Sequence, residues 1–260
     1  MSEQSAARLY AYEPQGARCP VPSAGLGRFL NGPRDNRLLA ALPEDSYNAL
    51  MPFLERVDMP LRSVLYESGG ARRFVYFPTS SVVSLLYVLE NGASAQFAVT
   101  GNDGVVGLSV FMSGEPASNR AVVQAAGCGY QVRASVFKAE FERSVPLQRL
   151  LLRYAQALIC QMAHTAVCNR HHSVNQQLCR LLLLSLDRLP ANELAMTQER
   201  IAGMLGVRRV GVTQAAGKLQ ADGLIDYRRG RITVLDREGL EQRVCECYGI
   251  VKEEYGRLLD

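Results

Sequence analysis

The chain has 260 residues, which is enough for two domains with separate hydrophobic cores. It is 48% hydrophobic and 21% charged, with a formal net charge of +4, as in an ordinary globular protein. No apolar run approaches the length of a membrane span, and no charged-then-apolar leader opens the chain, so we expect a cytoplasmic protein without membrane contact. The seven cysteines are odd in number and scattered, which favours reduced thiols over a disulfide framework.

The sequence carries no enzymatic motif. It contains no Gly-x-Ser-x-Gly, no P-loop and no His-Glu-x-x-His, and its three histidines all lie in the helical middle of the chain. A hydrolase or transferase needs a nucleophile beside a base, and no such pair can be assembled. We therefore expect a protein that is not an enzyme and that needs no cofactor.

The first half of the chain is β-rich. Residues 1–28 are polar and contain several Pro and Gly residues, so we expect a mobile arm. Leucines at helical spacing over residues 36–54 predict helix around a start at Pro43. Short β-rich runs follow at residues 63–67, 74–77, 82–89, 95–100, 105–110, 120–124 and 130–133. With the hairpin signal Asn91-Gly92 and a closing helix over residues 135–143, they predict a jelly-roll-like β-roll domain spanning residues 29–145.

A long helix is predicted from Pro146 onward, over residues 146–172. One stripe has the alternating spacing of a coiled-coil seam and consists of Leu147, Leu151, Tyr154, Leu158, Gln161, Thr165 and Cys168. A second stripe consists of Leu152, Ala155, Ile159, Ala163 and Ala166. Two such faces indicate that the helix docks on its own domain and also meets a second subunit, with Leu151, Tyr154, Leu158, Gln161 and Thr165 in the dimer interface. Burial of this helix between two domains of one chain is the alternative.

The remaining residues, 173–260, contain the pattern of a winged helix-turn-helix. After a further helix over residues 174–189, Thr197 can cap a helix that Gly206 ends, because a left-handed residue is needed there. A second helix runs over residues 208–223. Residues 224–227 and 231–235 predict two strands joined by a tight turn at Arg229-Gly230.

The charge of this motif favours a nucleic acid as its partner. Residues 196–232 hold seven basic and three acidic residues, so their charge of 7 − 3 = +4 equals that of the whole chain. The excess lies on the turn, the second helix and the wing, where phosphates of double-stranded DNA would lie. We predict DNA contacts from Thr197, Arg208, Arg209, Val210, Thr213, Gln214, Lys218, Arg228 and Arg229.

A β-roll, a long helix and a winged helix-turn-helix, in this order, resemble the Crp/Fnr family of bacterial transcription regulators. The resemblance covers residues 36–240 and is most specific in TQERIAGMLGVRR and GKLQADGLIDYRRGRITVLDREGL. It implies an α+β fold with a cyclic-nucleotide-binding-like β-roll, and a homodimer that binds a two-fold symmetric operator. It also implies RNA polymerase as a further partner.

The recognition helix departs from the family pattern, Ser-Arg-Glu-x-x-x-Arg. The matching positions here are Arg208, Arg209, Val210 and Gln214. Arg209 keeps its place and suits guanine, whereas Val210 suits a thymine methyl and Gln214 suits adenine. The operator should therefore differ from the family's commonest one. The alternative is a ligand-, redox- or metal-sensing module with weakened DNA reading.

The effector pocket departs further. In members of the family that bind cyclic AMP, a Gly-Glu pair holds the ribose and an Arg-Ser pair holds the phosphate. Here Gly107 is followed by Leu108, and Asn119-Arg120 replaces the Arg-Ser pair. We therefore expect an altered pocket that does not bind cyclic AMP in the usual way. The sequence does not identify a small-molecule effector.

Cys160, His164 and Cys168 recur every four residues and share one face of the long helix. Thiolate and imidazole at this spacing can bind zinc or iron if a fourth ligand arrives. Burial of the two thiols in a helix interface is the commoner outcome, and we predict no metal site. Cys245 and Cys247, two apart on a predicted helix, should point to different sides and make poor ligands for one ion.

Overall fold

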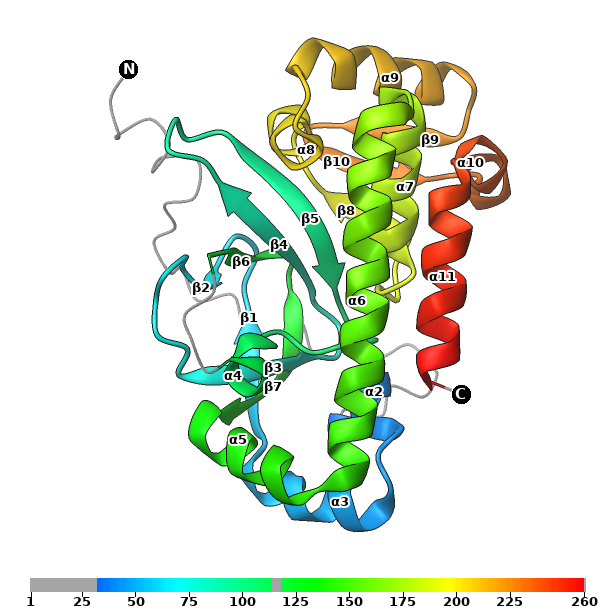
Figure 1. Ribbon diagram of the computed structural model, residues 1–260. Helices are drawn as coiled ribbons and strands as arrows, with labels where there is room; N and C mark the ends of the chain where they lie inside the picture. Colours follow the sequence, from blue (N-terminus) through cyan, green and yellow to red (C-terminus); the bar gives the residue numbers. More distant parts are fainter. Residues whose placement is uncertain (1–31, 114–117, 260) are drawn as a thin grey trace.

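The computed structural model describes residues 32–113 and 118–259. The predicted arm over residues 1–28, with Cys19, lies outside the described residues. Within them, two antiparallel sheets come first, a long helix follows, and a helical domain with a small sheet completes the chain (Figure 1). The α+β class and the order of its parts are those predicted.

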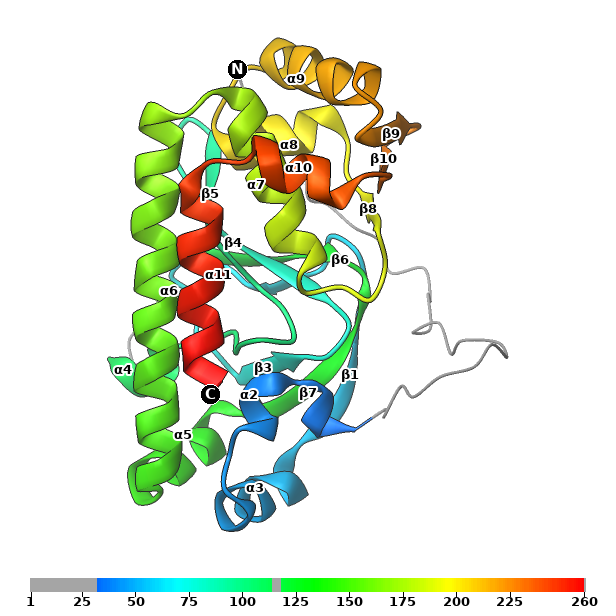
Figure 2. The same cartoon turned by 90° about the vertical axis from the view of Figure 1, so that its right-hand side faces the viewer.

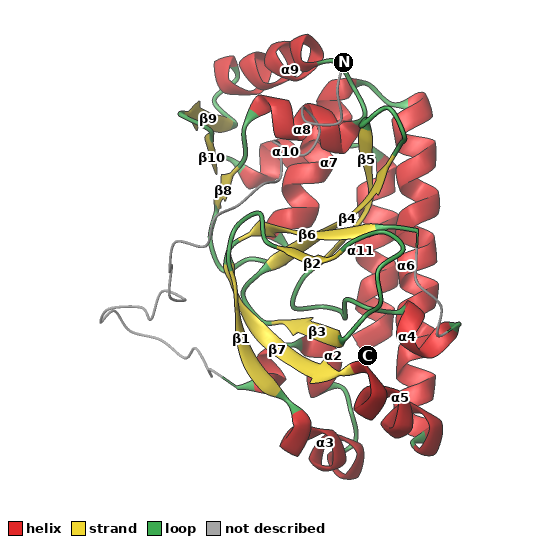
Figure 3. Ribbon diagram, turned by 90° about the vertical axis from the view of Figure 1, so that its left-hand side faces the viewer, coloured by secondary structure: helices red, strands yellow, loops and turns green. Residues whose placement is uncertain are grey.

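The N-terminal domain is built on two sheets, which Figure 3 shows as separate layers. Its short helical segments are η1 (Pro33–Asp35), α2 (Arg37–Ala40), α3 (Glu44–Leu50) and η2 (Met51–Phe53). One sheet has the order β1-β7-β3, with bounds Glu55–Met59, Gly127–Arg133 and Phe74–Pro78. The other has the order β2-β6-β4-β5, with bounds Val64–Tyr66, Arg120–Ala125, Val82–Val88 and Ser94–Thr100. The core between them is formed by apolar side chains such as Val75, Phe77, Val82 and Val99.

The strands of this domain differ from the prediction in two places, and the predicted hairpin is present. The strand predicted at residues 105–110 is wrong: only an isolated bridge joins Val106 to Tyr76, and helix α4 (Ser109–Met112) begins after Gly107, whose φ is 116°. Strand β1 was not predicted, because its alternating pattern is mostly polar. The Asn91-Gly92 hairpin is confirmed, with the Leu89 amide donating to the Ala93 carbonyl at 2.8 Å and Gly92 at a φ of 80°.

Helix α6 (Val145–His171) is the long central element, and α5 (Ala134–Arg143) leads into it. The Ser144 side chain caps it by accepting from the Leu147 amide. The last helix of the chain, α11 (Glu246–Leu259), runs along α6, and strand β5 lies against another face of α6 (Figure 2).

The C-terminal domain contains the predicted helices and wing. Its elements are α7 (Val174–Leu186), β8 (Glu193–Ala195), α8 (Gln198–Leu205), α9 (Arg209–Ala221), β9 (Ile225–Arg228), β10 (Arg231–Val234), α10 (Arg237–Arg243) and α11. Strand β8, which was not predicted, pairs with β10, so the wing is a three-stranded sheet of order β8-β10-β9. No helix among the described residues is both long and apolar enough to cross a bilayer.

A buried ion pair joins the two domains. Asp103, in the loop after β5, accepts from Arg188, which follows α7, with 2.8 Å between Oδ2 and Nη2. Their side chains are only 9% and 2% exposed. The Arg188 guanidinium also lies 5.0 Å from the centre of the Tyr255 ring of α11. A Cβ on Gly101 would lie 2.6 Å from the Arg188 side chain, so this glycine is what lets the arginine enter.

Replacing Asp103 by alanine should destabilise the fold strongly. The Arg188 charge would remain buried without a partner, a situation that costs about 3–5 kcal/mol in free energy of unfolding. Urea denaturation would measure the loss. Asp58→Ala, at an exposed position on β1, is the control and should change stability by no more than about 0.5 kcal/mol. Equal effects of the two variants would contradict the role assigned to the buried pair.

Candidate DNA-binding site

The first helix of the motif, α8, has the two ends that the sequence predicts. The Thr197 side chain accepts from the Arg200 amide at 3.3 Å and caps its start. Gly206 ends it with a φ of 66°, a left-handed conformation that glycine adopts without strain. The sharp turn after Gly206 lets α9 cross α8 as the second helix of a helix-turn-helix.

Helix α9 separates an apolar face from an exposed polar one. Its buried face packs on α7 and α8 through Val212, Ala215, Ala216 and Leu219. The opposite face is exposed and carries the predicted residues Arg209, Val210, Thr213, Gln214 and Lys218. The helix lies at one end of the molecule, with this motif on the outside (Figure 1). Its dimensions suit insertion in a major groove.

The wing is a tight hairpin with basic residues at its tip. Arg229 and Gly230 both have positive φ, of 51° and 76°, as a type I′ turn requires. Arg228 is 80% exposed and lies 2.9 Å from Asp226, an exposed pairing that leaves the guanidinium accessible. The wing thus holds two arginines beside the start of α8, since the Gly230 position is in contact range of the Thr197 side chain.

Three cations of the motif form no ion pair with any carboxylate of residues 32–113 and 118–259: Arg208, Lys218 and Arg229. Arg209 is 67% exposed, and its Nε is 3.9 Å from Glu199, a weak surface contact. Asp222, at the end of α9, is neutralised by Arg243 of α10. All nine residues predicted to contact DNA are exposed. Several cations of this surface can therefore bind a DNA phosphate without first breaking an ion pair within the protein.

Not all basic residues of the motif belong to this surface. The Arg200 guanidinium donates to the Val123 carbonyl of the β-roll at 2.9 Å, and Arg231 pairs with Glu193 inside the wing sheet. Arg200 therefore ties α8 to the N-terminal domain. Charge counting along the sequence could not separate these two residues from the others.

A groove of about 460 Å³ lies between the start of α8, the start of α9 and the wing tip. Its lining combines three predicted residues with four that were not predicted as contacts, Gln198, Glu199, Tyr227 and Gly230. Gln198 accepts a hydrogen bond from the Thr213 hydroxyl at 2.7 Å and so fixes that side chain. The Tyr227 hydroxyl donates to the Met196 carbonyl at 2.8 Å. Burial raises the pKa of Tyr227 to about 12, so it stays a neutral donor at physiological pH.

The four residues of the predicted effector pocket lie on the β-roll. Leu108 is partly buried against the hydrophobic core. Asn119 accepts from Arg72 at 3.2 Å, and Arg120 lies 2.9 Å from the Glu67 carboxylate. Arg72 was not predicted. Its guanidinium stacks on the Tyr66 ring at 4.0 Å, while its Nε and Nη1 are buried without a hydrogen-bond partner in the described part of the chain.

The helix seam predicted as a dimer interface is covered by this chain itself, which corrects that prediction. Leu151 and Tyr154 are 0% exposed, and Leu158, Gln161 and Thr165 are also buried. The Gln161 amide bonds both backbone groups of Val99 in β5, accepting at 2.6 Å and donating at 3.2 Å. A coiled-coil spacing indicates that a stripe of side chains is buried. It does not indicate whether the stripe packs against the same chain or against a second subunit.

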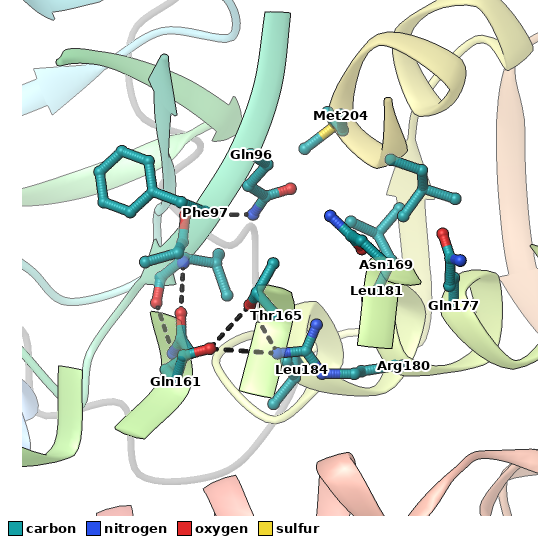
Figure 4. Close-up of a pocket in the computed structure, with 13 residues that line it drawn as sticks. Gln96, Phe97, Gln161, Thr165, Asn169, Gln177, Arg180, Leu181, Leu184 and Met204 are labelled. Atoms are coloured by element: carbon teal, nitrogen blue, oxygen red, sulfur yellow. Dashed lines mark hydrogen bonds between the residues drawn. The ribbon is translucent and has the colours of Figure 1, made fainter. Parts of the chain in front are cut away.

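A small cavity lies where this seam meets β5, α7 and α8 (Figure 4). Its volume is about 30 Å³, close to the room that one water molecule takes in the liquid and far below a nucleotide. Gln96, Gln161 and Arg180 contribute polar atoms to its wall, together with apolar side chains such as Met204. This junction is tightly packed and holds no effector-sized pocket.

The predicted group Cys160, His164 and Cys168 is not brought together as one site. Among the described residues, the one grouping of possible metal ligands includes Cys168 but neither of the other two. Cys168 is fully buried and lies 3.6 Å, Sγ to Sγ, from Cys245. The partner of Cys168 is thus a residue that the sequence places far away.

The chain is similar to known proteins in the sequence of one domain and in its fold. Residues 176–243 match the family model described as the Crp-like helix-turn-helix domain. No curated protein matches the chain in sequence. Among solved structures, a transcriptional regulator of the Crp/Fnr family from Eubacterium rectale is 17% identical with a TM-score of 0.64, covering 81% of this chain and 98% of its own.

Two further structures are similar over most of their length. FixK2 from Bradyrhizobium japonicum has a TM-score of 0.60 at 17% identity, covering 74% of this chain and 98% of its own. The global regulator CLP from Xanthomonas campestris has a TM-score of 0.57 at 16% identity, covering 74% and 99%. Such likeness at low identity shows the fold. The chain therefore has the fold of the Crp/Fnr transcription regulators and carries their type of helix-turn-helix domain at residues 176–243.

Proposed function

We propose that this protein is a sequence-specific DNA-binding transcription regulator that acts as a homodimer on a two-fold symmetric operator. The observation that carries the proposal is the exposed face formed by α9 and the wing, with Arg208, Lys218 and Arg229 free of ion pairs among the described residues. Such cations bind phosphates and release counterions, so affinity should fall steeply as salt rises. RNA polymerase is the further partner through which a regulator of this type would act.

The roles of the exposed residues follow from their places in the motif. Arg209, in the first turn of α9, is placed to bind a guanine edge with two hydrogen bonds. Val210 is 59% exposed and offers a methyl contact to thymine, and Gln214, one turn later, suits adenine. Arg229, at the wing tip, is placed for the phosphate backbone, whose contacts carry no sequence information.

Selection of binding sites from random duplex DNA, followed by anisotropy titrations at several salt concentrations, tests the proposal. Arg209→Ala should relax selection at one base pair and cost about 1–3 kcal/mol per half-site. Arg229→Ala should weaken all sequences alike and lower the salt slope by about 1 per half-site, because one phosphate contact is lost. Identical behaviour of the two variants would refute the separation of base and phosphate contacts, and a flat salt response would refute DNA binding by this face.

The dimer is proposed on the second apolar stripe of α6. Leu152 and Ile159 are 61% and 50% exposed, and they follow the seven-residue spacing of a coiled coil together with Ala166. Large aliphatic side chains exposed along one helix favour a partner surface. We propose residues 29–145 as the effector domain, 146–172 as the dimerisation helix and 173–260 as the DNA-binding domain. A two-fold symmetric operator would require the two recognition helices of the dimer to lie about one DNA turn apart.

Ile159→Arg should convert the dimer to monomer, because it would bury an unpaired charge in the interface. Sedimentation equilibrium measures the association. Ile250→Arg is the matched control, since Ile250 is 40% exposed but lies on α11. A dimer that survives Ile159→Arg would move the interface elsewhere. Leu158→Arg, in contrast, should unfold the protein, because Leu158 is buried in its own β-roll.

We also propose that the β-roll does not bind cyclic AMP in the family's usual way. Leu108 offers no carboxylate to the ribose, and Asn119 offers an amide, already bonded to Arg72, where a phosphate ligand would need a cation. A ribose hydroxyl buried without an acceptor costs about 1–3 kcal/mol. The buried, unbonded Nε and Nη1 of Arg72 support an anionic effector of different shape.

Calorimetric titration of the full chain with cyclic AMP up to millimolar concentration should give no tight one-to-one binding. DNA affinity should be equal with and without the nucleotide. Leu108→Glu is the informative variant, because it restores the missing acceptor at the matching position. Tight binding by the wild-type chain, or DNA binding that depends on cyclic AMP, would overturn this interpretation of the pocket.

A further inference from the structure

Four possible metal ligands meet where α6 ends and α11 begins. The donor atoms of Cys168, His172, Cys245 and Cys247 all lie within 4.8 Å of one another. Cys168 is in the last turn of α6, and His172 follows it by four residues, just past the helix end. The expectation that Cys245 and Cys247 point to different sides is wrong, because α11 begins only at Glu246 and Cys245 therefore precedes the helix.

We propose that these four side chains bind one zinc ion, which fastens the start of α11 to the end of α6. A tetrahedral zinc ion with Zn–S bonds of about 2.3 Å holds its sulfurs about 3.8 Å apart, and a sulfur about 3.6 Å from a ligating nitrogen. The Cys168 and Cys245 sulfurs are 3.6 Å apart, and the Cys247 sulfur is 3.8 Å from His172 Nδ1. These two distances match those of a tetrahedral set, while a disulfide would require about 2.05 Å between the sulfurs.

The histidine is oriented as a zinc ligand. Its Nδ1 faces the sulfurs, and its Nε2 lies 3.4 Å from the Glu246 carboxylate. A carboxylate that accepts the second ring N–H fixes the tautomer and keeps the other nitrogen free to ligate, an arrangement common around protein zinc. Glu246 is thus a positioning residue, held next to the ligands by its place between Cys245 and Cys247.

The charge around the cluster suits the metal-bound form. Zinc with three thiolates and a neutral imidazole carries a net charge of −1. Arg180 of α7 is 7% exposed, and no carboxylate among the described residues pairs with it. Its Nη2 donates to the Thr165 hydroxyl at 2.8 Å, whereas its Nε is buried without a hydrogen-bond partner (Figure 4). Its charge acts on Cys168 and Cys247, so a zinc–thiolate centre would supply the missing counterion.

Metal binding should release protons, because zinc binds a cysteine as the thiolate and not as the thiol. Since the protein supplies all four ligands, the site is of the closed, structural kind, and its binding energy adds to the stability of the fold.

Zinc analysis of the full-length protein, purified without chelators, tests the proposal. The wild-type chain should contain about one zinc per chain, and so should Cys160→Ser, the control on the same helix outside the cluster. Cys168→Ser and Cys247→Ser should lose it. Glu246→Ala should bind zinc about 10–100-fold more weakly, as is usual when an outer partner of a ligating histidine is removed.

A pair of variants at His172 separates ligation from folding. His172→Cys supplies a fourth thiolate and should retain zinc, whereas His172→Ala should lose most of the affinity. Titration of the metal-free wild type with Co²⁺ should give the visible absorption of tetrahedral cobalt with thiolate ligands, together with release of protons. A wild-type protein without zinc that gives an octahedral cobalt spectrum would overturn the proposal. So would a stable Cys168–Cys245 disulfide in the freshly isolated protein.

Discussion

The buried ion pair of Arg188 and Asp103 fixes the position of the C-terminal domain against the N-terminal domain. The two side chains are 2% and 9% exposed, so water cannot solvate either charge if the other moves away. The pair is therefore held in one geometry. Tyr255 of α11 lies beside this pair, and Tyr154 of α6 bonds to the Val105 carbonyl just beyond it. The β-roll, the long helix and the DNA-binding domain are therefore positioned around one point.

Helix α6 has two faces with different surroundings. The face that carries Tyr154 and Gln161 is used entirely inside the chain, against β5 and α11. The face that carries Leu152 and Ile159 remains exposed. One helix thus binds its own chain on one face and presents exposed aliphatic side chains on another.

The sequence predicts best what short-range rules decide. The cap at Thr197, the left-handed Gly206 and the turn at Arg229-Gly230 each follow from local backbone chemistry, and the structure contains all three. The sequence could not show what covers a buried stripe, which is why Leu158 and Gln161 were assigned to the wrong surface. The grouping of Cys168 with Cys245 depends on α11 folding back along α6, and no pattern near either cysteine reports that.

The two hydrogen bonds between Gln161 and Val99 have a consequence for solubility. Strand β5 ends the four-stranded sheet, and an edge strand presents free amides and carbonyls to which another chain can add. The Gln161 side chain pairs with that edge as a neighbouring strand would, because it occupies one donor and one acceptor of Val99 near the end of β5. The long helix thereby guards the β-roll against edge-to-edge aggregation.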